Sequence, residues 1–140
     1  MIKILVIEHD PSDPVLRAVN AGLAEEDDVA AGQVDILVRR VESRRLAAQR
    51  PDLVVLDLHM PGISGLEAVK VINEEIPGVR VLMLTVSEDA QDLMEALRAG
   101  ASGYLLKNVE TDALLDAIRR AAAGDSVVSP QMTAKLIQGV

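Results

Sequence analysis

The segment DLVVLDLHMPG, residues 52–62, decides the fold. It is an apolar run that ends on one carboxylate, and residues typical of turns follow it directly. A short apolar run bounded by turn residues indicates a strand that is buried on both faces of a sheet. We therefore expect Asp57 to lie at the carboxyl end of a central strand, where open α/β sheets place their functional sites.

The rest of the chain alternates apolar runs with amphipathic, helix-like segments. This alternation occurs five times before a terminal helix, and it predicts an α/β fold: a doubly wound, five-stranded parallel sheet with helices on both faces. Besides the strand that ends at Asp57, the expected strands are 2–7, 34–41, 79–85 and 103–107. The expected helices begin near residues 14, 42, 66, 89, 111 and 130. The acidic cluster 25–28 is expected to be a solvated loop and not a metal site, because nothing in its spacing directs the carboxylates toward one point.

Capping residues mark several of the predicted helix ends. Asp13 followed by Pro14 is typical of an N-cap and the first helical position. Thr111-Asp112 is expected to cap a later helix. Gly100 and Gly124 are each expected to end a helix, because glycine readily adopts the left-handed conformation that follows many helices.

Composition places the chain among single-domain soluble proteins. Its 140 residues suit one core, 49% of them are hydrophobic, and no apolar run reaches bilayer length. The net charge of −8 disfavours direct DNA binding, whose affinity comes largely from neutralising phosphates. Without cysteine there is no thiol nucleophile or zinc thiolate site, and one tyrosine offers no stacking platform for bases or a flavin. We expect a cytoplasmic protein without a membrane attachment.

Functional side chains follow four of the five predicted strands. The first strand ends on Glu8-His9-Asp10, the central strand on Asp57, the next on Thr85 and the last on Lys107. All strands of a parallel sheet point their carboxyl ends to one edge. We therefore expect these groups to meet there, although they lie far apart in the sequence.

Such a set of groups is suited to phosphoryl chemistry on a carboxylate. Carboxylates that lie close together cannot all ionise without cost, so they favour a hard divalent cation such as Mg²⁺. A carboxylate beside the ion can attack a phosphoryl group as a nucleophile and form an acyl phosphate. A lysine and a hydroxyl group can then hold the phosphoryl oxygens by charge and hydrogen bonds.

Several motifs resemble the receiver domains of two-component response regulators. They are PDLVVLD at 51–57 with MPG at 60–62 and GLE at 65–67, VLMLT at 81–85, and AGASGYLLK at 99–107. The segment 123–130 is similar to the one that leads out of receivers preceding a LuxR-type (NarL/FixJ) helix-turn-helix domain. The resemblance is weaker over residues 20–50. It implies a flavodoxin-like sheet of order 2-1-3-4-5, a receiver domain at 1–124 and a linker at 125–140, with the output domain outside this chain.

The resemblance also implies a role for each residue at the strand ends. Asp57 would accept a phosphoryl group from a sensor histidine kinase, and Lys107 would pair with that group. Thr85 would move toward the phosphoryl oxygens, and Tyr104 would follow by turning inward. Val86 stands where the family prefers a smaller residue, which would narrow access to Asp57.

The metal site departs from the family pattern. The resemblance implies that Mg²⁺ is bound by Glu8, by the side chain of Asp57 and by the backbone carbonyl of His59. The family usually has two acidic residues in succession after the first strand, and here His9 holds the second place. A neutral imidazole is a poor ligand for Mg²⁺ beside a carboxylate. Either Asp10 replaces the missing acid through a shifted loop, or Mg²⁺ binds weakly, or the domain acts without phosphorylation.

Three functions remain open on these residues. The first is a phosphorylated receiver that is not an enzyme and switches an output domain or partner, in transcription regulation. The second is a pseudo-receiver that acts by binding or dimerisation alone, and the third is a phosphatase with His59 as its candidate general acid. Met132, Leu136 and Ile137 give the last helix one apolar side, which suits a homodimer contact, packing against the body or a junction. That helix lacks the basic residues of a DNA-recognition helix, so DNA contact would need an output domain.

Overall fold

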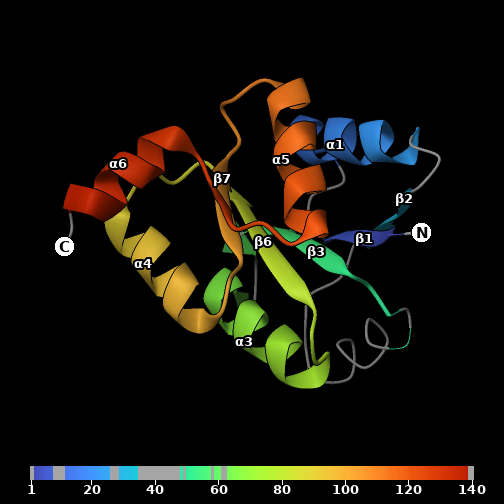
Figure 1. Cartoon of the computed structure of the whole chain (residues 1–140), viewed down its shortest axis with the longest axis horizontal. Helices are drawn as coiled ribbons and strands as arrows, with labels where there is room; N and C mark the ends of the chain where they lie inside the picture. Colours follow the sequence, from blue (N-terminus) through green and yellow to red (C-terminus); the bar gives the residue numbers. More distant parts are fainter. Residues whose placement is uncertain are drawn as a thin grey trace.

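The structure is a computed structural model that describes residues 2–7, 12–25, 29–34, 48, 50–57, 59–60 and 63–138. A parallel sheet lies at its centre, between two layers of helices (Figure 1). The strands of this sheet are β1 (Ile2–Ile7), β2 (Val29–Val34), β3 (Leu53–Asp57), β6 (Arg80–Thr85), β7 (Gly103–Leu106) and β8 (Val127–Val128). A separate antiparallel pair is formed by β4 (His59–Met60) and β5 (Ile63–Ser64).

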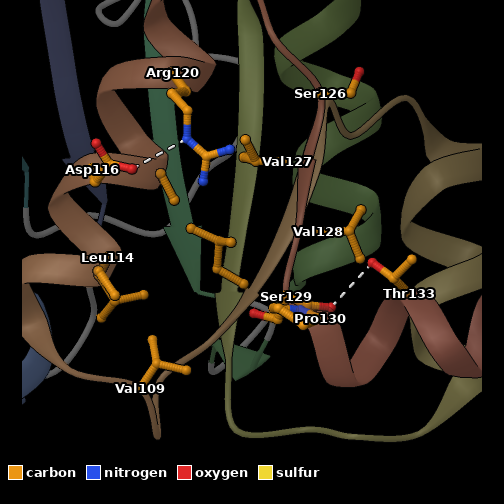
Figure 2. A pocket seen from close by; sticks show the side chains of 13 residues that line it. Val109, Leu114, Asp116, Arg120, Ser126, Val127, Val128, Ser129, Pro130 and Thr133 are labelled. Carbon is orange, nitrogen blue, oxygen red and sulfur yellow. Dashed lines mark hydrogen bonds and ion pairs between the residues drawn. The ribbon is translucent and has the colours of Figure 1, made fainter.

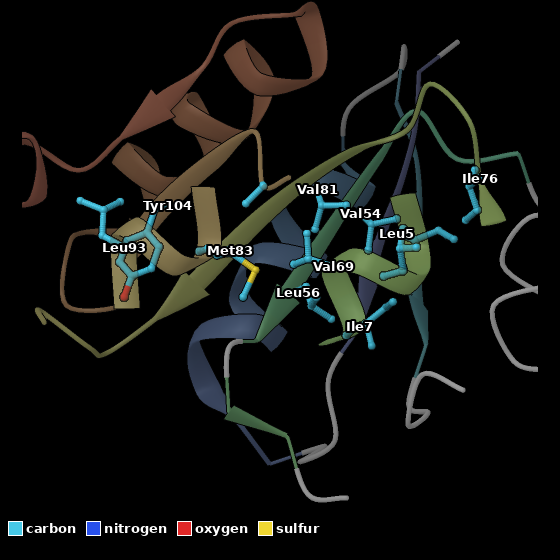
Figure 3. Packing of buried hydrophobic residues seen from close by; sticks show 14 of the residues in the cluster. Leu5, Ile7, Val54, Leu56, Val69, Ile76, Val81, Met83, Leu93 and Tyr104 are labelled. Carbon is cyan, nitrogen blue, oxygen red and sulfur yellow. The ribbon is translucent and has the colours of Figure 1, made fainter. Parts of the chain in front are cut away.

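Two hydrophobic clusters fill the space between the sheet and its helices. The helices are α1 (Pro14–Ala24), α3 (Gly65–Glu75), α4 (Ala90–Ala99), α5 (Thr111–Ala123) and α6 (Pro130–Gln138). Side chains of α1 and α5 pack on one face of the sheet, and side chains of α3, α4 and α6 pack on the other (Figure 1). Figure 3 shows part of the cluster on the face covered by α3, α4 and α6, in which the ring of Tyr104 is buried among aliphatic side chains.

The strand order is β2-β1-β3-β6-β7-β8, and every neighbouring pair is parallel. Its first five strands have the predicted flavodoxin-like order 2-1-3-4-5, which is confirmed. The short strand β8 was not predicted, and it pairs with β7 through Gly103 and Tyr104. A Cβ atom on Gly103 would lie 2.5 Å from the carbonyl oxygen of Val127, so only glycine lets β8 approach this closely.

The second strand lies earlier in the chain than the sequence pattern predicts. It spans Val29–Val34 and pairs with β1 over six residues, from Ile2↔Val29 to Ile7↔Val34. Apart from Val34, the strand predicted at 34–41 lies outside the described residues, and β2 occupies a segment that was not predicted to be a strand. The physical reason is that pairing with the central strand β1 outweighs the low strand propensity of alanine and glycine.

Most of the predicted helix ends are correct. The Asp13 side chain accepts hydrogen bonds at the start of α1, and Pro14 is the first helical residue. Gly100 and Gly124 follow α4 and α5 with φ of 111° and 119°. The N-cap of α5 is Glu110 rather than Thr111, and its side chain makes no capping hydrogen bond. The helix predicted from residue 42 lies almost wholly outside the described residues.

The segment after α5 packs against the body of the domain. Ser129 Oγ accepts a hydrogen bond of 2.9 Å from the amide of Leu106, and the amide of Ser129 donates to the carbonyl of Tyr104 at 3.0 Å. Met132 is buried in the same cluster as Tyr104, whereas Ile137 is 70% exposed. Packing against the body therefore accounts for part of the apolar side of α6. Among the described residues, no helix is long and apolar enough to cross a membrane.

Candidate functional site

Polar groups from three strand ends lie at the carboxyl edge of the sheet. Strand β3 ends at Asp57, β6 ends at Thr85, and Lys107 directly follows β7. In the sheet, Asp57 is aligned with Leu84 and Thr85 with Leu106. The register therefore places Thr85 one residue beyond the level of Asp57, and Lys107 one residue beyond the level of Thr85.

Asp57 and Lys107 form an ion pair. Lys107 Nζ lies 2.9 Å from Asp57 Oδ2, and the two side chains are 11% and 9% exposed. Charges that are largely removed from water attract each other more strongly than surface charges do. The sequence predicts this pair from the convergence of two strand ends that are 50 residues apart.

Asp13 is a second partner of the same lysine. Asp13 Oδ2 accepts a hydrogen bond of 2.6 Å from Lys107 Nζ. The other oxygen, Asp13 Oδ1, accepts from the amides of Val15 at 3.0 Å and Leu16 at 3.2 Å at the start of α1. Sequence reasoning assigned Asp13 only the capping role. No local pattern signals its contact with a residue 94 positions away.

The contacts described above keep Lys107 and Asp13 charged. Burial alone would lower the pKa of Lys107, but hydrogen bonds to Asp13 and Asp57 outweigh burial and raise the pKa above 10.5. Burial likewise would raise the pKa of Asp13, but its hydrogen bonds to Lys107 and to the amide of Leu16 lower it below 3.8. Lys107 is therefore a fixed positive charge at this edge of the sheet near neutral pH.

Thr85 and Tyr104 contact the same short loop. Both side chains are buried. Thr85 Oγ1 accepts a hydrogen bond of 3.1 Å from the amide of Ser87, and the Tyr104 hydroxyl donates to the carbonyl of Ser87 at 3.0 Å. Burial raises the pKa of Tyr104 above 10.0. The tyrosine ring thus lies inside the domain in this structure, and its hydroxyl group is hydrogen-bonded to Ser87, the residue that follows Val86.

Comparison with known proteins identifies the family to which this fold belongs. Residues 4–119 match the response regulator receiver domain. The chain belongs to the response regulator receiver domain family. The receiver domain is similar to a nitrate/nitrite response regulator protein homolog of Haemophilus influenzae, with 36% identity over 138 residues that make up 98% of this chain and 64% of that protein.

A second curated relative and a solved structure are also named as response regulators. The nitrate/nitrite response regulator protein NarL of Escherichia coli (strain K12) is 45% identical over 83 residues, which are 59% of this chain and 38% of that protein. A two-component response regulator of the LuxR family from Aurantimonas sp. SI85-9A1 superposes with a TM-score of 0.83 at 27% identity, covering 98% of this chain and 96% of the other. The receiver domain spans less than two thirds of the length of the curated regulators named here.

Most of the residues predicted to bind Mg²⁺ lie outside the described part of the chain. Glu8, His9 and Asp10 are not described, and His59 is described only through its backbone in β4. Among the described residues, no three or more histidine, aspartate or glutamate side chains gather as a metal site. Asp57 offers the hard carboxylate oxygens that Mg²⁺ prefers, so the described part fits one ligand of the ion.

One cavity lies beside the strand-end groups of the receiver domain, and a larger one lies elsewhere. One of about 410 Å³ opens beside Asp13 and Lys107, and it is also lined by Val86, which is 70% exposed. A larger one of about 530 Å³ lies between α5 and the β8–α6 segment (Figure 2). None of Asp57, Thr85, Tyr104 and Lys107 lines the larger cavity. The ion pairs, and not cavity size, therefore locate the site at the ends of the strands.

Proposed function

We propose that Asp57 accepts a phosphoryl group from a sensor histidine kinase, and that this reaction switches an output domain or a partner in transcription regulation. The observation that carries the proposal is the 2.9 Å contact between Lys107 Nζ and Asp57 Oδ2 at the end of β3. In the transfer, the bond from phosphorus to the donor's leaving group breaks, and the leaving group keeps the electron pair. A new bond joins phosphorus to a carboxylate oxygen of Asp57.

The neighbouring groups would stabilise the phosphorylated state. Lys107 would pair with the phosphoryl oxygens by a charged hydrogen bond. The Thr85 hydroxyl would leave the amide of Ser87 and donate to the same oxygens, and Tyr104 would be held inward, as it already lies here. Both hydroxyl groups contact Ser87, so a movement of Thr85 is transmitted to the loop that holds Tyr104.

Receiver domains bind Mg²⁺ at the phosphorylation site, and we assign the ion here to Asp57, Glu8 and the backbone carbonyl of His59. Asp10 is the candidate for the ligand that His9 does not supply. Mg²⁺ held by these residues would supply positive charge that offsets the negative charge of the transferred phosphoryl group.

We assign residues 1–124 to the receiver domain and residues 125–140 to a linker. The relatives named above are response regulators, so we place this chain in the cytoplasm and treat it as a signalling module without enzymatic turnover. Its expected partners are a sensor histidine kinase and a second copy of the same chain, with which it would form a homodimer. DNA contact would require an output domain beyond this chain, since the net charge is −8.

Intact-mass measurement after incubation with acetyl phosphate and Mg²⁺ tests the proposal. The expected result is a mass increase of one phosphoryl group, which Asp57→Asn abolishes. Asp52→Asn is the matched control, because Asp52 is an exposed aspartate directly before the same strand. An unchanged mass for the parent chain, or an increase that survives Asp57→Asn, would contradict the assignment.

A second candidate is a pseudo-receiver that signals by binding or dimerisation without phosphorylation. His9 in the place of a metal-binding acid is the observation that favours it. Under this alternative the parent chain gains no phosphoryl group, and its oligomeric state is the same with and without the phosphodonor.

A further inference from the structure

The geometry of Asp13 gives it two contacts of different kinds. One carboxylate oxygen accepts hydrogen bonds from the amides of Val15 and Leu16, and these bonds fix the side chain to the first turn of α1. The other oxygen accepts a hydrogen bond of 2.6 Å from Lys107 Nζ. The backbone of α1 therefore fixes the orientation of the Asp13 carboxylate, and the carboxylate in turn holds the side chain of Lys107, which follows β7.

Lys107 needs such an anchor. A lysine side chain has four flexible carbon–carbon bonds and loses considerable rotamer entropy when it is fixed. Here Nζ lies between two carboxylates, 2.6 Å from Asp13 and 2.9 Å from Asp57. Only the Asp13 contact keeps its chemical identity when a phosphoryl group is attached to Asp57.

We propose that Asp13 is a positioning residue that holds the Lys107 ammonium group where the phosphoryl oxygens arrive. The inference rests on the proposed phosphorylation of Asp57. During the transfer Lys107 neither gives nor takes a proton, and Asp13 touches neither phosphorus nor the donor. A cation that is already in place stabilises developing negative charge without having to reorganise.

A double-mutant cycle separates this role from helix capping. Asp13→Asn keeps an oxygen that caps α1 but removes the charge that holds Lys107. The second variant is Lys107→Met, and the third carries both changes. Asp89→Asn is the matched control, because Asp89 caps α4 through the amide of Gln91 at 2.8 Å without contacting Lys107.

The phosphorylation rate is measured by intact mass over a series of acetyl phosphate concentrations at fixed Mg²⁺. Asp13→Asn is expected to lower the maximal rate about tenfold and to leave the half-saturating donor concentration unchanged, because a misplaced cation weakens stabilisation of the transition state. In the Lys107→Met background, Asp13→Asn is expected to have no further effect. Asp89→Asn is expected to behave like the parent chain.

Each other outcome counts against the inference. An equal loss in both backgrounds shows that Asp13 acts through the fold and not through Lys107. An unchanged or increased maximal rate in Asp13→Asn shows that Lys107 needs no anchor. A parent chain that takes up no phosphoryl group overturns the proposed function itself, and the role of Asp13 with it, so the two failures are distinguishable.

Discussion

Tyr104 is the single tyrosine of a chain without tryptophan, and it is fully buried. Burial raises its pKa above 10.0, so the folded state favours the protonated phenol. We predict that the ultraviolet absorbance of phenolate appears at higher pH in the native protein than in urea. The stability contributed by the protonated phenol is present below the unfolded pKa and is lost as pH rises through the folded pKa. A native pKa at or below 10.0 would show that the ring is exposed.

Asp13 provides a second pH-dependent test at the scale of one residue. Its pKa lies below 3.8 in the folded protein, so its charged hydrogen bonds stabilise the fold above 3.8 and are lost as pH falls through the folded pKa. We predict that Asp13→Asn lowers the free energy of unfolding by about 1–2 kcal/mol near neutral pH. Urea unfolding at a series of pH values should show this difference shrinking below 3.8. A difference that does not change with pH would mean that the charge is irrelevant.

The two partners of Lys107 differ in how far the sequence predicts them. Asp57 ends a strongly apolar run, and the strand-end rule for parallel sheets is enough to bring it to Lys107. Asp13 lies in the loop before α1, where the direction of its side chain depends on the geometry of the turn and not on any strand. Its capping role is visible locally, because it needs only Pro14 and the helix that follows. Its contact with Lys107 depends on tertiary packing, which local patterns do not contain.

At the scale of elements, one hydroxyl group connects the last part of the chain to the sheet. Ser129 Oγ satisfies the buried amide of Leu106 at 2.9 Å. We predict that Ser129→Ala lowers the free energy of unfolding by about 1–3 kcal/mol, because that amide is left without a partner. Ser126→Ala is the control, since Ser126 is exposed in the same segment and should change stability little. Equal effects of the two changes in urea unfolding would contradict this role.

Strand β2 shows what sequence patterns miss at the same scale. Its residues, VAAGQV, have little of the β-branched or aromatic character that marks a strand. Strand β3 is recognisable because it is buried on both faces and is therefore continuously apolar. An outer strand carries a weaker signal, because its position depends mainly on hydrogen bonds to its neighbour. The helices are better predicted, since their caps and apolar faces are local.

At the scale of the whole molecule, residues 127–138 complete both the sheet and the core. Strand β8 covers β7, Met132 fills the cluster around Tyr104, and Lys135 Nζ donates to the carbonyl of Glu88. A chain that ends at Gly124 loses all three contacts and exposes the edge of β7. Such an edge can pair with another chain.

We therefore predict that the chain ending at Gly124 unfolds at a lower temperature and self-associates, in comparison with a chain ending at Gln138. Thermal unfolding and sedimentation velocity measure the two effects. Equal melting temperatures and a monomer in both samples would show that the receiver domain does not depend on its final segment.

The strand order also has a consequence for how the domain forms as it is synthesised. After β2 pairs with β1, each later strand adds next to one that already exists, in the sequence β3, β6, β7 and β8. No strand has to be inserted between two finished neighbours, so the sheet can grow outward on one side while the ribosome extends the chain. During this growth the newest strand always presents open hydrogen-bonding groups, and those of β7 at Gly103 and Tyr104 are covered only when residues 127–128 emerge. The edge of β7 can therefore pair with other chains until residues 127–128 have been made.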